Sequence, residues 1–186
     1  MINHIDLTTV LRRTVCDLYS DLVTRPTGAA VRSGIEQQLA EVGARTLTVI
    51  DFSRVGLLDF SCADEIVAKL LLRQRAPDGR PDAYFVFCGL SDSHLEAIEA
   101  VLERHGLAIV AERDDGTPIL VGDVDEAERL AWTALTRLGR AEAEEVAREA
   151  GLDPERTACL LAGLSSRRIA MRLDDAYVAL DIPPRP

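Results

Sequence analysis

The segment Thr46–Leu72, TLTVIDFSRVGLLDFSCADEIVAKLLL, changes its hydrophobic period partway along, and this change constrains the fold more than any other feature of the chain. Thr46–Phe52 is a short apolar run rich in β-branched residues, which predicts a buried strand. Ser53–Gly56 then predicts a loop. After Cys62 the apolar residues recur every three or four positions, as on one face of a helix: Ala63, Ile66, Val67, Leu70 and Leu71. We therefore expect a strand, a turn and a covering helix.

The turn between the strand and the helix reads Asp59-Phe60-Ser61-Cys62. We expect Ser61 to be the N-cap of the helix, with its hydroxyl directed at the free amides of the first turn. Such a helix end carries partial positive charge and tolerates an anion or a phosphate. The turn is therefore a candidate regulatory or docking site, and a simple helix cap is the alternative.

This arrangement resembles the sulfate-transporter/anti-sigma-antagonist (STAS) family, in its divergent STAS-like branch, over Thr46 to about Val121. In that family a strand, a serine-containing turn and a helix form a phosphorylation switch that docks on an anti-sigma kinase. The family turn reads Asp-Ser-Ser-Gly, so Phe60 stands where the phosphorylated serine usually lies, and Ser61 matches the second serine. The resemblance implies a partner-binding surface made by these residues: Asp59, Phe60, Ser61, Cys62 and Asp64.

The first domain is expected to span residues 1–124. Its alternating strands and helices predict an α/β layer with a sheet covered by helices. Residues 1–45 read as helical, with Asp6 as a cap and with a second helix over about Thr27–Val42. Ser93 and Glu96 predict a capping box for a later helix. Three further strands are expected at Ala83–Cys88, Leu107–Glu112 and Pro118–Gly122.

A second domain is expected from about residue 125, where alanine- and glutamate-rich helical sequence replaces the strands. Helices are predicted over Glu126–Leu138, with Leu130 and Leu138 inward, over Ala141–Ala150, and from Asp153-Pro154 to about Gly163. A hairpin follows. Three helices and a hairpin resemble a small winged helix-turn-helix domain over residues 125–182, and residues 183–186 are expected to be a loose tail.

The charge of the chain bears on whether it binds nucleic acid. The net charge is −10, and residues 125–186 contain nine Arg and no Lys against twelve Asp and Glu. Binding to the phosphate backbone needs a basic surface, so DNA is less favoured than a protein partner. DNA binding stays open through four arginines on the third helix and the wing: Arg156, Arg167, Arg168 and Arg172.

A second candidate site lies at the start of the second helix, where Thr24, Arg25, Thr27 and Gly28 place an arginine and two hydroxyls. This arrangement can receive an anion, although helix capping alone also explains it. The chain contains neither GxxxxGK[ST] nor GxGxxG, so no nucleotide-binding motif supports the site.

Metal, disulfide and catalytic motifs are not evident. Cys16, Cys62, Cys88 and Cys159 are scattered without a CxxC pair, and the histidines do not fall at ligand spacing beside them, so we expect no metal, cofactor or disulfide framework. A hydrolase that uses Ser61 or Cys62 would need a base that no motif supplies. With no apolar run of about 20 residues, a cytoplasmic protein without membrane insertion is expected.

These observations predict a non-enzymatic cytoplasmic regulator that acts in signalling or transcription control. Its STAS-like domain would bind a regulatory protein of the anti-sigma or kinase-like type, as an anti-sigma factor antagonist does, and its winged-helix-like domain would transmit the bound state. The alternative is a DNA-binding transcriptional regulator that forms a homodimer through its α/β domain.

Overall fold

The structure is a computed structural model that describes residues 2–16, 20–42, 46–76, 83–113 and 115–180. The chain forms two compact units, Met1–Asp123 and Val124–Pro186. The division falls within the stretch where the composition of the sequence changes.

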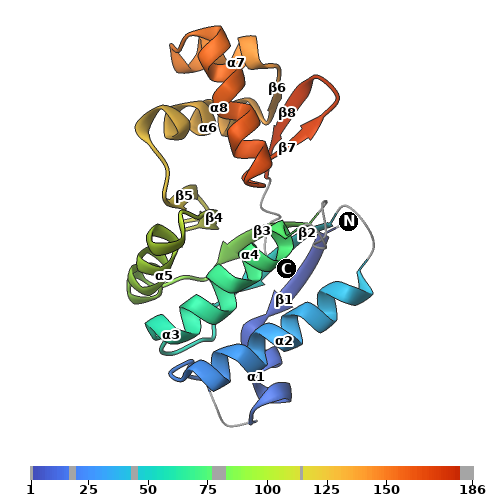
Figure 1. Cartoon of the computed structure of the whole chain (residues 1–186), viewed down its shortest axis with the longest axis vertical. Coiled ribbons are helices and arrows are strands. Elements are labelled where there is room, and N and C mark those ends of the chain that lie inside the picture. Colours follow the sequence, from blue (N-terminus) through green and yellow to red (C-terminus); the bar gives the residue numbers. More distant parts are fainter. Residues whose placement is uncertain (1, 17–19, 43–45, 77–82, 114, 181–186) are drawn as a thin grey trace. The chain divides into compact units, whose positions relative to one another are not determined.

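The first unit contains a five-stranded sheet in the order β1-β2-β3-β4-β5 (Figure 1). The first four strands are parallel, and β5 pairs antiparallel with β4. The strands are β1 (Ile2–Asp6), β2 (Thr46–Asp51), β3 (Ala83–Cys88), β4 (Ala108–Glu112) and β5 (Pro118–Gly122). The predicted α/β class is therefore confirmed, with a sheet that is mostly parallel.

The helical expectation for residues 1–45 did not include β1, which precedes the first helix. This strand lies at the edge of the sheet and buries only Ile5 among its five residues. A short edge strand with a single buried position has no alternating apolar pattern, and its sequence INHID gives little strand signal. Its pairing with β2 decides its conformation.

The helices of this unit pack on one face of the sheet. A chain that adds parallel strands in sequential order through right-handed crossovers places each connecting helix on the same side. Accordingly, one apolar cluster joins Ile5, Ile50 and Phe87 of neighbouring strands to residues of every helix in the unit. The helices are α1 (Leu7–Thr14), α2 (Arg25–Glu41), α3 (Phe60–Ala63), the π-helix η1 (Asp64–Lys69), α4 (Leu70–Arg75) and α5 (Asp92–His105).

The capping residues of these helices follow from the sequence only in part. Asp6 caps α1 as predicted, and its carboxylate accepts the Thr8 amide. The capping box of α5 consists of Ser91 and His94 instead of Ser93 and Glu96. His94 is 2 % exposed, and its ring also bonds the Gly56 carbonyl at 3.0 Å, so a tertiary contact fixes the cap two residues earlier.

The second unit contains three helices and a three-stranded antiparallel sheet among its described residues, with strand order β6-β8-β7. Trp132, Leu161 and Tyr177 lie in its core. Its elements are α6 (Glu126–Leu138), β6 (Arg140–Ala141), α7 (Ala143–Ala150), α8 (Pro154–Ser166), β7 (Ala170–Leu173) and β8 (Ala176–Ala179).

Three sequence expectations for this unit are corrected. The second helix begins at Ala143, because Arg140 and Ala141 pair with β8. The third helix continues past Gly163 to Ser166. Leu130 and Leu138 are 45 % and 41 % exposed, so they do not face the core as the periodicity of α6 predicted.

The helices are modest in length, and α2, with 17 residues, is the longest continuous α-helix described. Within the described ranges, none is at once long and apolar enough to pass through a lipid bilayer. The expected tail at 183–186 lies outside the described residues.

Candidate functional site

The Asp59–Cys62 turn is held in place by a second segment of backbone. After β2 the chain makes one parallel bridge between Leu58 and Leu22. The Leu22 amide donates to the Leu57 carbonyl at 2.7 Å, and the Asp59 amide donates to the Leu22 carbonyl at 2.8 Å. These bonds fix the chain direction on entry to the turn, so the turn is part of the ordered framework of the unit.

The N-cap of the helix is Asp59, and the expectation that Ser61 is the cap is wrong. The Asp59 carboxylate accepts the Cys62 amide at 2.7 Å, and the helix begins at Phe60. Ser61 lies within the first turn, and its hydroxyl donates to the two Asp59 oxygens at 2.9 and 3.1 Å. A carboxylate is a strong N-cap whose charge is favourable at this end of a helix, and here it also binds the serine.

Two apolar side chains project from the surface beside the turn. Leu57 is 59 % exposed and Phe60 is 38 % exposed. The Arg104 guanidinium of α5 lies 6.0 Å from the centre of the Phe60 ring, within cation–π range. We call Leu57, Phe60, Ser61 and Arg104 the turn surface.

Cys62 faces the interior and is fully buried. Its thiol donates to the Thr24 carbonyl, with 2.9 Å between sulfur and oxygen. Burial, together with the negative charge of Asp59, raises the pKa of the Cys62 thiol to about 12. A thiol in the first turn of a helix normally has its pKa lowered by the helix dipole, and here burial outweighs that effect. Cys62 is therefore a packing residue.

Asp64, which the sequence placed on the partner-binding surface, is only 6 % exposed. Its carboxylate accepts Arg25 Nη1 at 2.9 Å and is paired with His105 Nε2 at 2.8 Å. Burial by itself raises the pKa of Asp64. The hydrogen bonds and charges of Arg25 and His105 lower the pKa by more than burial raises it, so the net shift is downward. Asp64 thus ties the π-helix to α2 and α5 beneath the turn surface.

Glu65 is also buried, at 3 % exposure. It accepts Arg25 Nη1 at 2.9 Å and Arg32 Nε at 3.4 Å, and it forms an ion pair with Lys69. Burial favours a higher pKa for Glu65, and the hydrogen bonds from Lys69 and Arg25 shift the net pKa below its usual value. We call Arg25, Arg32, Asp64, Glu65, Lys69 and His105 the charged network.

The candidate anion site at the start of α2 is occupied by the protein itself. Arg25, the expected anion ligand, already binds the Asp64 and Glu65 carboxylates. Thr24 caps α2, and the Thr24 and Thr27 hydroxyls lie 2.8 Å apart. A Cβ at Gly28 would lie 2.9 Å from the Cys62 Cα, so this glycine permits close helix packing. These contacts agree with the alternative explanation, in which Thr24–Gly28 only caps the helix.

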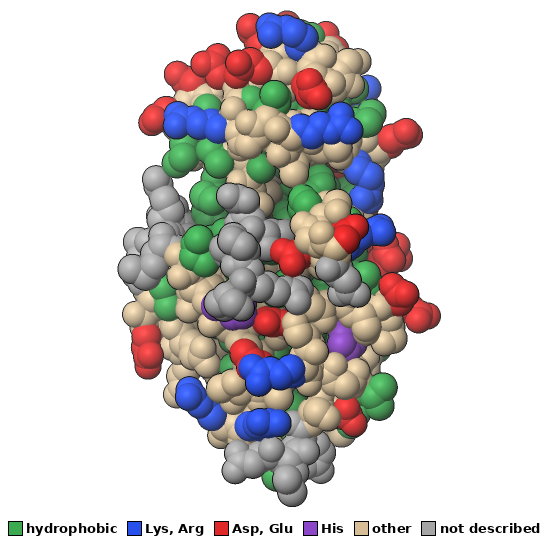
Figure 2. Space-filling model, turned by 180° about the vertical axis from the view of Figure 1, so that it is seen from behind, with side chains coloured by type: hydrophobic (Ala, Val, Ile, Leu, Met, Phe, Trp, Pro, Cys, Tyr) green, Lys and Arg blue, Asp and Glu red, His purple; other side chains and the backbone are tan. Residues whose placement is uncertain are grey.

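The four arginines of the second unit do not form one exposed basic surface. Arg156 is exposed on the first turn of α8, and Arg172 is exposed above the Tyr177 ring. Arg167 is half-buried and pairs with Glu128 of α6 at 2.8 Å, and Arg168 is half-buried with a φ of +61°. On the face drawn in Figure 2, the acidic and basic side chains that are described lie intermixed.

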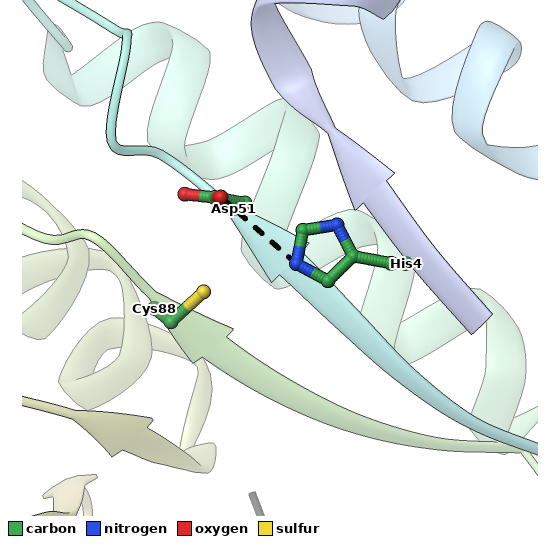
Figure 3. Close-up of side chains that lie close together, drawn as sticks. All are labelled: His4, Asp51 and Cys88. Carbon is green, nitrogen blue, oxygen red and sulfur yellow. Dashed lines mark ion pairs between the residues drawn. The ribbon is translucent and has the colours of Figure 1, made fainter. Parts of the chain in front are cut away.

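The structure brings together three residues that the sequence analysis left apart. His4, Asp51 and Cys88 each offer a ligand atom, and these atoms lie within 4.8 Å of one another (Figure 3). Ligand spacing along the sequence does not reveal them, because they come from three neighbouring strands. The available signal was that Asp51 and Cys88 end two buried, β-branched or aromatic runs.

Of the five residues proposed to bind a partner, Phe60 is exposed, Asp59 and Ser61 are half-buried, and Cys62 and Asp64 are buried. The sequence did not single out Leu57 or Arg104, whose exposure beside the turn depends on tertiary packing. No protein-family model matches the chain, and no curated protein matches it either.

Proposed function

We propose that this chain is a non-enzymatic regulatory protein of the cytoplasm. In this proposal the first unit is a STAS-like domain that binds a signalling protein of the anti-sigma or kinase-like type through the turn surface. The second unit is a winged-helix-like domain that passes the bound state on. The observation that carries the proposal is the exposure of Leu57 and Phe60 at a turn whose backbone is fixed on both sides.

The rigidity of the turn favours binding. Ordering a mobile loop at an interface costs free energy, and a surface that is already ordered avoids that cost. Here the backbone bonds to Leu22 and the charged network hold the turn before any partner arrives. An aromatic ring beside an arginine is also the type of group that commonly dominates binding energy at protein interfaces.

Ser61 offers a means of control in this proposal. Its hydroxyl is bonded to the Asp59 carboxylate, so a phosphate at this position would stand against a negative charge. A negative group would therefore disturb the N-cap and the turn surface together. Ser61→Asp is expected to weaken partner binding, whereas Ser61→Ala leaves the cap bond between Asp59 and Cys62 in place.

The order of helices and strands in the second unit supports the proposal of a winged-helix-like domain. Three helices, a short strand after the first of them and a terminal hairpin form one helical layer and one small sheet. The exposed residues at the start of α8 include Glu155 as well as Arg156, and the hairpin turn carries Asp174 and Asp175. Such a mixed surface favours a protein contact over the phosphate backbone.

The test is capture from native lysate with the full chain, followed by identification of bound protein and nucleic acid and by binding measurements with the purified partner. Phe60→Ser alters the turn surface, and Leu138→Ser is a matched control, because these side chains are 38 % and 41 % exposed. We expect an anti-sigma or kinase-like protein to bind wild type, Ser61→Ala and Leu138→Ser, and to be lost with Phe60→Ser and Ser61→Asp.

Two results would contradict the proposal. Equal capture of the same proteins by all variants would show that the turn surface is not part of the interface. Recovery of nucleic acid by all variants, with an affinity that falls steeply with salt and falls again in Arg156→Ala, would instead support the DNA-binding alternative.

A further inference from the structure

We propose that His4, Asp51 and Cys88 form a binding site for a divalent transition metal of the zinc type. Asp51 and Cys88 are register partners on β2 and β3, and each is the last residue of its strand. On the other side of β2, Asp51 is the register partner of Asp6, and His4 lies two residues before Asp6 on β1. Residues two apart on a strand share a face, so all three side chains stand on the same face of the sheet.

The three ligand atoms lie close together. His4 Nε2 and Asp51 Oδ2 are 3.9 Å apart, and the three ligand atoms all lie within 4.8 Å of one another. Ligands at about 2.0–2.3 Å from a tetrahedral metal lie about 3.3–3.8 Å from each other. Small side-chain rotations would therefore bring the observed separations to coordination geometry.

The arrangement differs from a catalytic relay. In a nucleophile–histidine–carboxylate relay, the two ring nitrogens serve two different partners. Here the nitrogen of His4 that faces Asp51 also points toward the space beside Cys88 (Figure 3). One nitrogen, one oxygen and one sulfur within 4.8 Å of one another form a set of atoms that a single metal ion can bind.

The chemistry of the ligands selects the class of ion. Thiolate and imidazole are poor ligands for magnesium and calcium, which take oxygen, and good ligands for zinc and cobalt. A thiolate, a carboxylate and a neutral imidazole together balance the charge of a dication, because the thiol proton is released to solvent on binding. Three protein ligands leave a fourth position for water or an external ligand.

The Asp51 carboxylate and the backbone that carries Cys88 are held by their surroundings. Asp51 Oδ1 accepts the Ser53 amide at 2.8 Å and also the Ser53 hydroxyl, which leaves Oδ2 facing His4. The Phe52 amide donates to the Cys88 carbonyl at 2.9 Å. A Cβ at Gly89, whose φ is +67°, would lie 2.4 Å from the Ser53 nitrogen, so the two strand exits are closely apposed.

A second acidic residue nearby, Asp6, is excluded from the group by its own contacts. Asp6 is the register partner of Asp51 across β1 and β2. Its oxygens accept the Thr8 amide and the Thr9 hydroxyl at 2.9 Å and pair with Arg54. Asp6 therefore caps α1, and the site consists of His4, Asp51 and Cys88.

The test is titration of the reduced, untagged full chain with Co²⁺, monitored by the thiolate-to-cobalt charge-transfer absorption, and with Zn²⁺ by calorimetry. We expect one equivalent to bind with the charge-transfer band. Cys88→Ser should abolish the band, and His4→Ala, a change at an exposed residue, should weaken binding at least about tenfold. Ser53→Ala should weaken it by about 10–100-fold, because that residue orients the carboxylate.

Cys159→Ser is the matched control, since Cys159 is an exposed thiol of the second unit. This variant should retain both the band and the affinity. The proposal is overturned if wild type shows no cobalt–thiolate band, if the band is lost in Cys159→Ser, or if folded His4→Ala binds as tightly as wild type. Circular dichroism of each variant establishes that it is folded.

Discussion

At the scale of single residues, burial decides the chemistry of the candidate site. Cys62 and Asp64 are close to the exposed Phe60 in sequence, yet both point inward. The thiol is held protonated by burial, and the carboxylate is held ionised by Arg25 and His105. The same short segment thus provides an exposed ring for contact and buried groups that fix its position.

The thiols are predicted to differ in reactivity. With its pKa raised to about 12, Cys62 carries almost no thiolate at pH 8, and its side chain is fully buried. Iodoacetamide at pH 8 should modify the exposed Cys159 and spare Cys62, as measured by peptide mass spectrometry. Denaturant should make the two equally reactive. Rapid alkylation of Cys62 in the folded protein would disprove the assignment.

The buried carboxylates predict a dependence of stability on pH. The pKa values of Asp64 and Glu65 are lowered from 3.8 and 4.5, so the folded state binds protons less readily than the unfolded state. The stabilisation from these two carboxylates is therefore fully present above about pH 5. It is lost as the pH falls through the unfolded-state pKa values and then through the lower folded-state pKa values. Urea unfolding followed by circular dichroism should show a lower midpoint at pH 3 than at pH 6.

A Glu65→Gln variant isolates this effect. The substitution removes the buried negative charge that pairs with Arg25, Arg32 and Lys69. We expect a loss of about 3 kcal/mol in unfolding free energy at pH 7. Its stability should also fall less between pH 6 and pH 3. Glu149→Gln, in an exposed pair with Arg137, is the control and should change stability by less than about 1 kcal/mol.

At the scale of elements, close packing of α2 against the α3–η1 segment positions the turn. Gly28 permits this approach, and the charged network joins the same two elements a little further along. The π-helix lies where Asp64 and Glu65 turn toward α2. Segments of π-helix are often found at functional sites, in keeping with the role proposed for the adjacent turn.

Two glycine substitutions test this packing. Gly28→Ala would place a Cβ 2.9 Å from the Cys62 Cα, and we expect a loss of about 1–3 kcal/mol in unfolding free energy despite the better helix propensity of alanine. Gly163→Ala, in α8 with no atom within 4 Å of the added Cβ, should stabilise by about 0.5–1 kcal/mol. Urea titration measures both, and a stabilising Gly28→Ala would refute the close approach.

At the scale of the whole molecule, the chain is acidic and divides into two units that each have a core. The only tryptophan, Trp132, is 5 % exposed within the core of the second unit. Its fluorescence therefore reports the second unit, whereas circular dichroism reports both. This placement allows the stability of each core to be followed in the intact chain.

Separate cores predict separate responses to core substitutions. Ile66→Ala in the first unit and Leu161→Ala in the second each truncate a fully buried side chain, and each should cost about 2–5 kcal/mol. Only Leu161→Ala should shift the urea midpoint of tryptophan fluorescence, whereas Ile66→Ala should shift a transition seen by circular dichroism. Movement of both probes by either substitution would show that the cores unfold as one.

Local patterns in the sequence determined most of the elements. The bounds of β3 and of α6, and the glycines that end α5, α6 and α7, follow from hydrophobic period and capping chemistry, which act over a few neighbouring residues. The α/β class followed from the alternation of these elements. The same signals predicted three helices and a hairpin in the second unit.

Contacts between distant segments decided the rest. β1 forms because it pairs with β2, and Asp59 instead of Ser61 caps the helix at a turn whose entry is fixed by the bond from the Asp59 amide to the Leu22 carbonyl. In the charged network, Arg25 and His105 reach Asp64 from 39 and 41 positions away, and the His4–Asp51–Cys88 group joins three different strands. Such groups depend on which strands and helices become neighbours, and no local period or spacing in the chain encodes that choice.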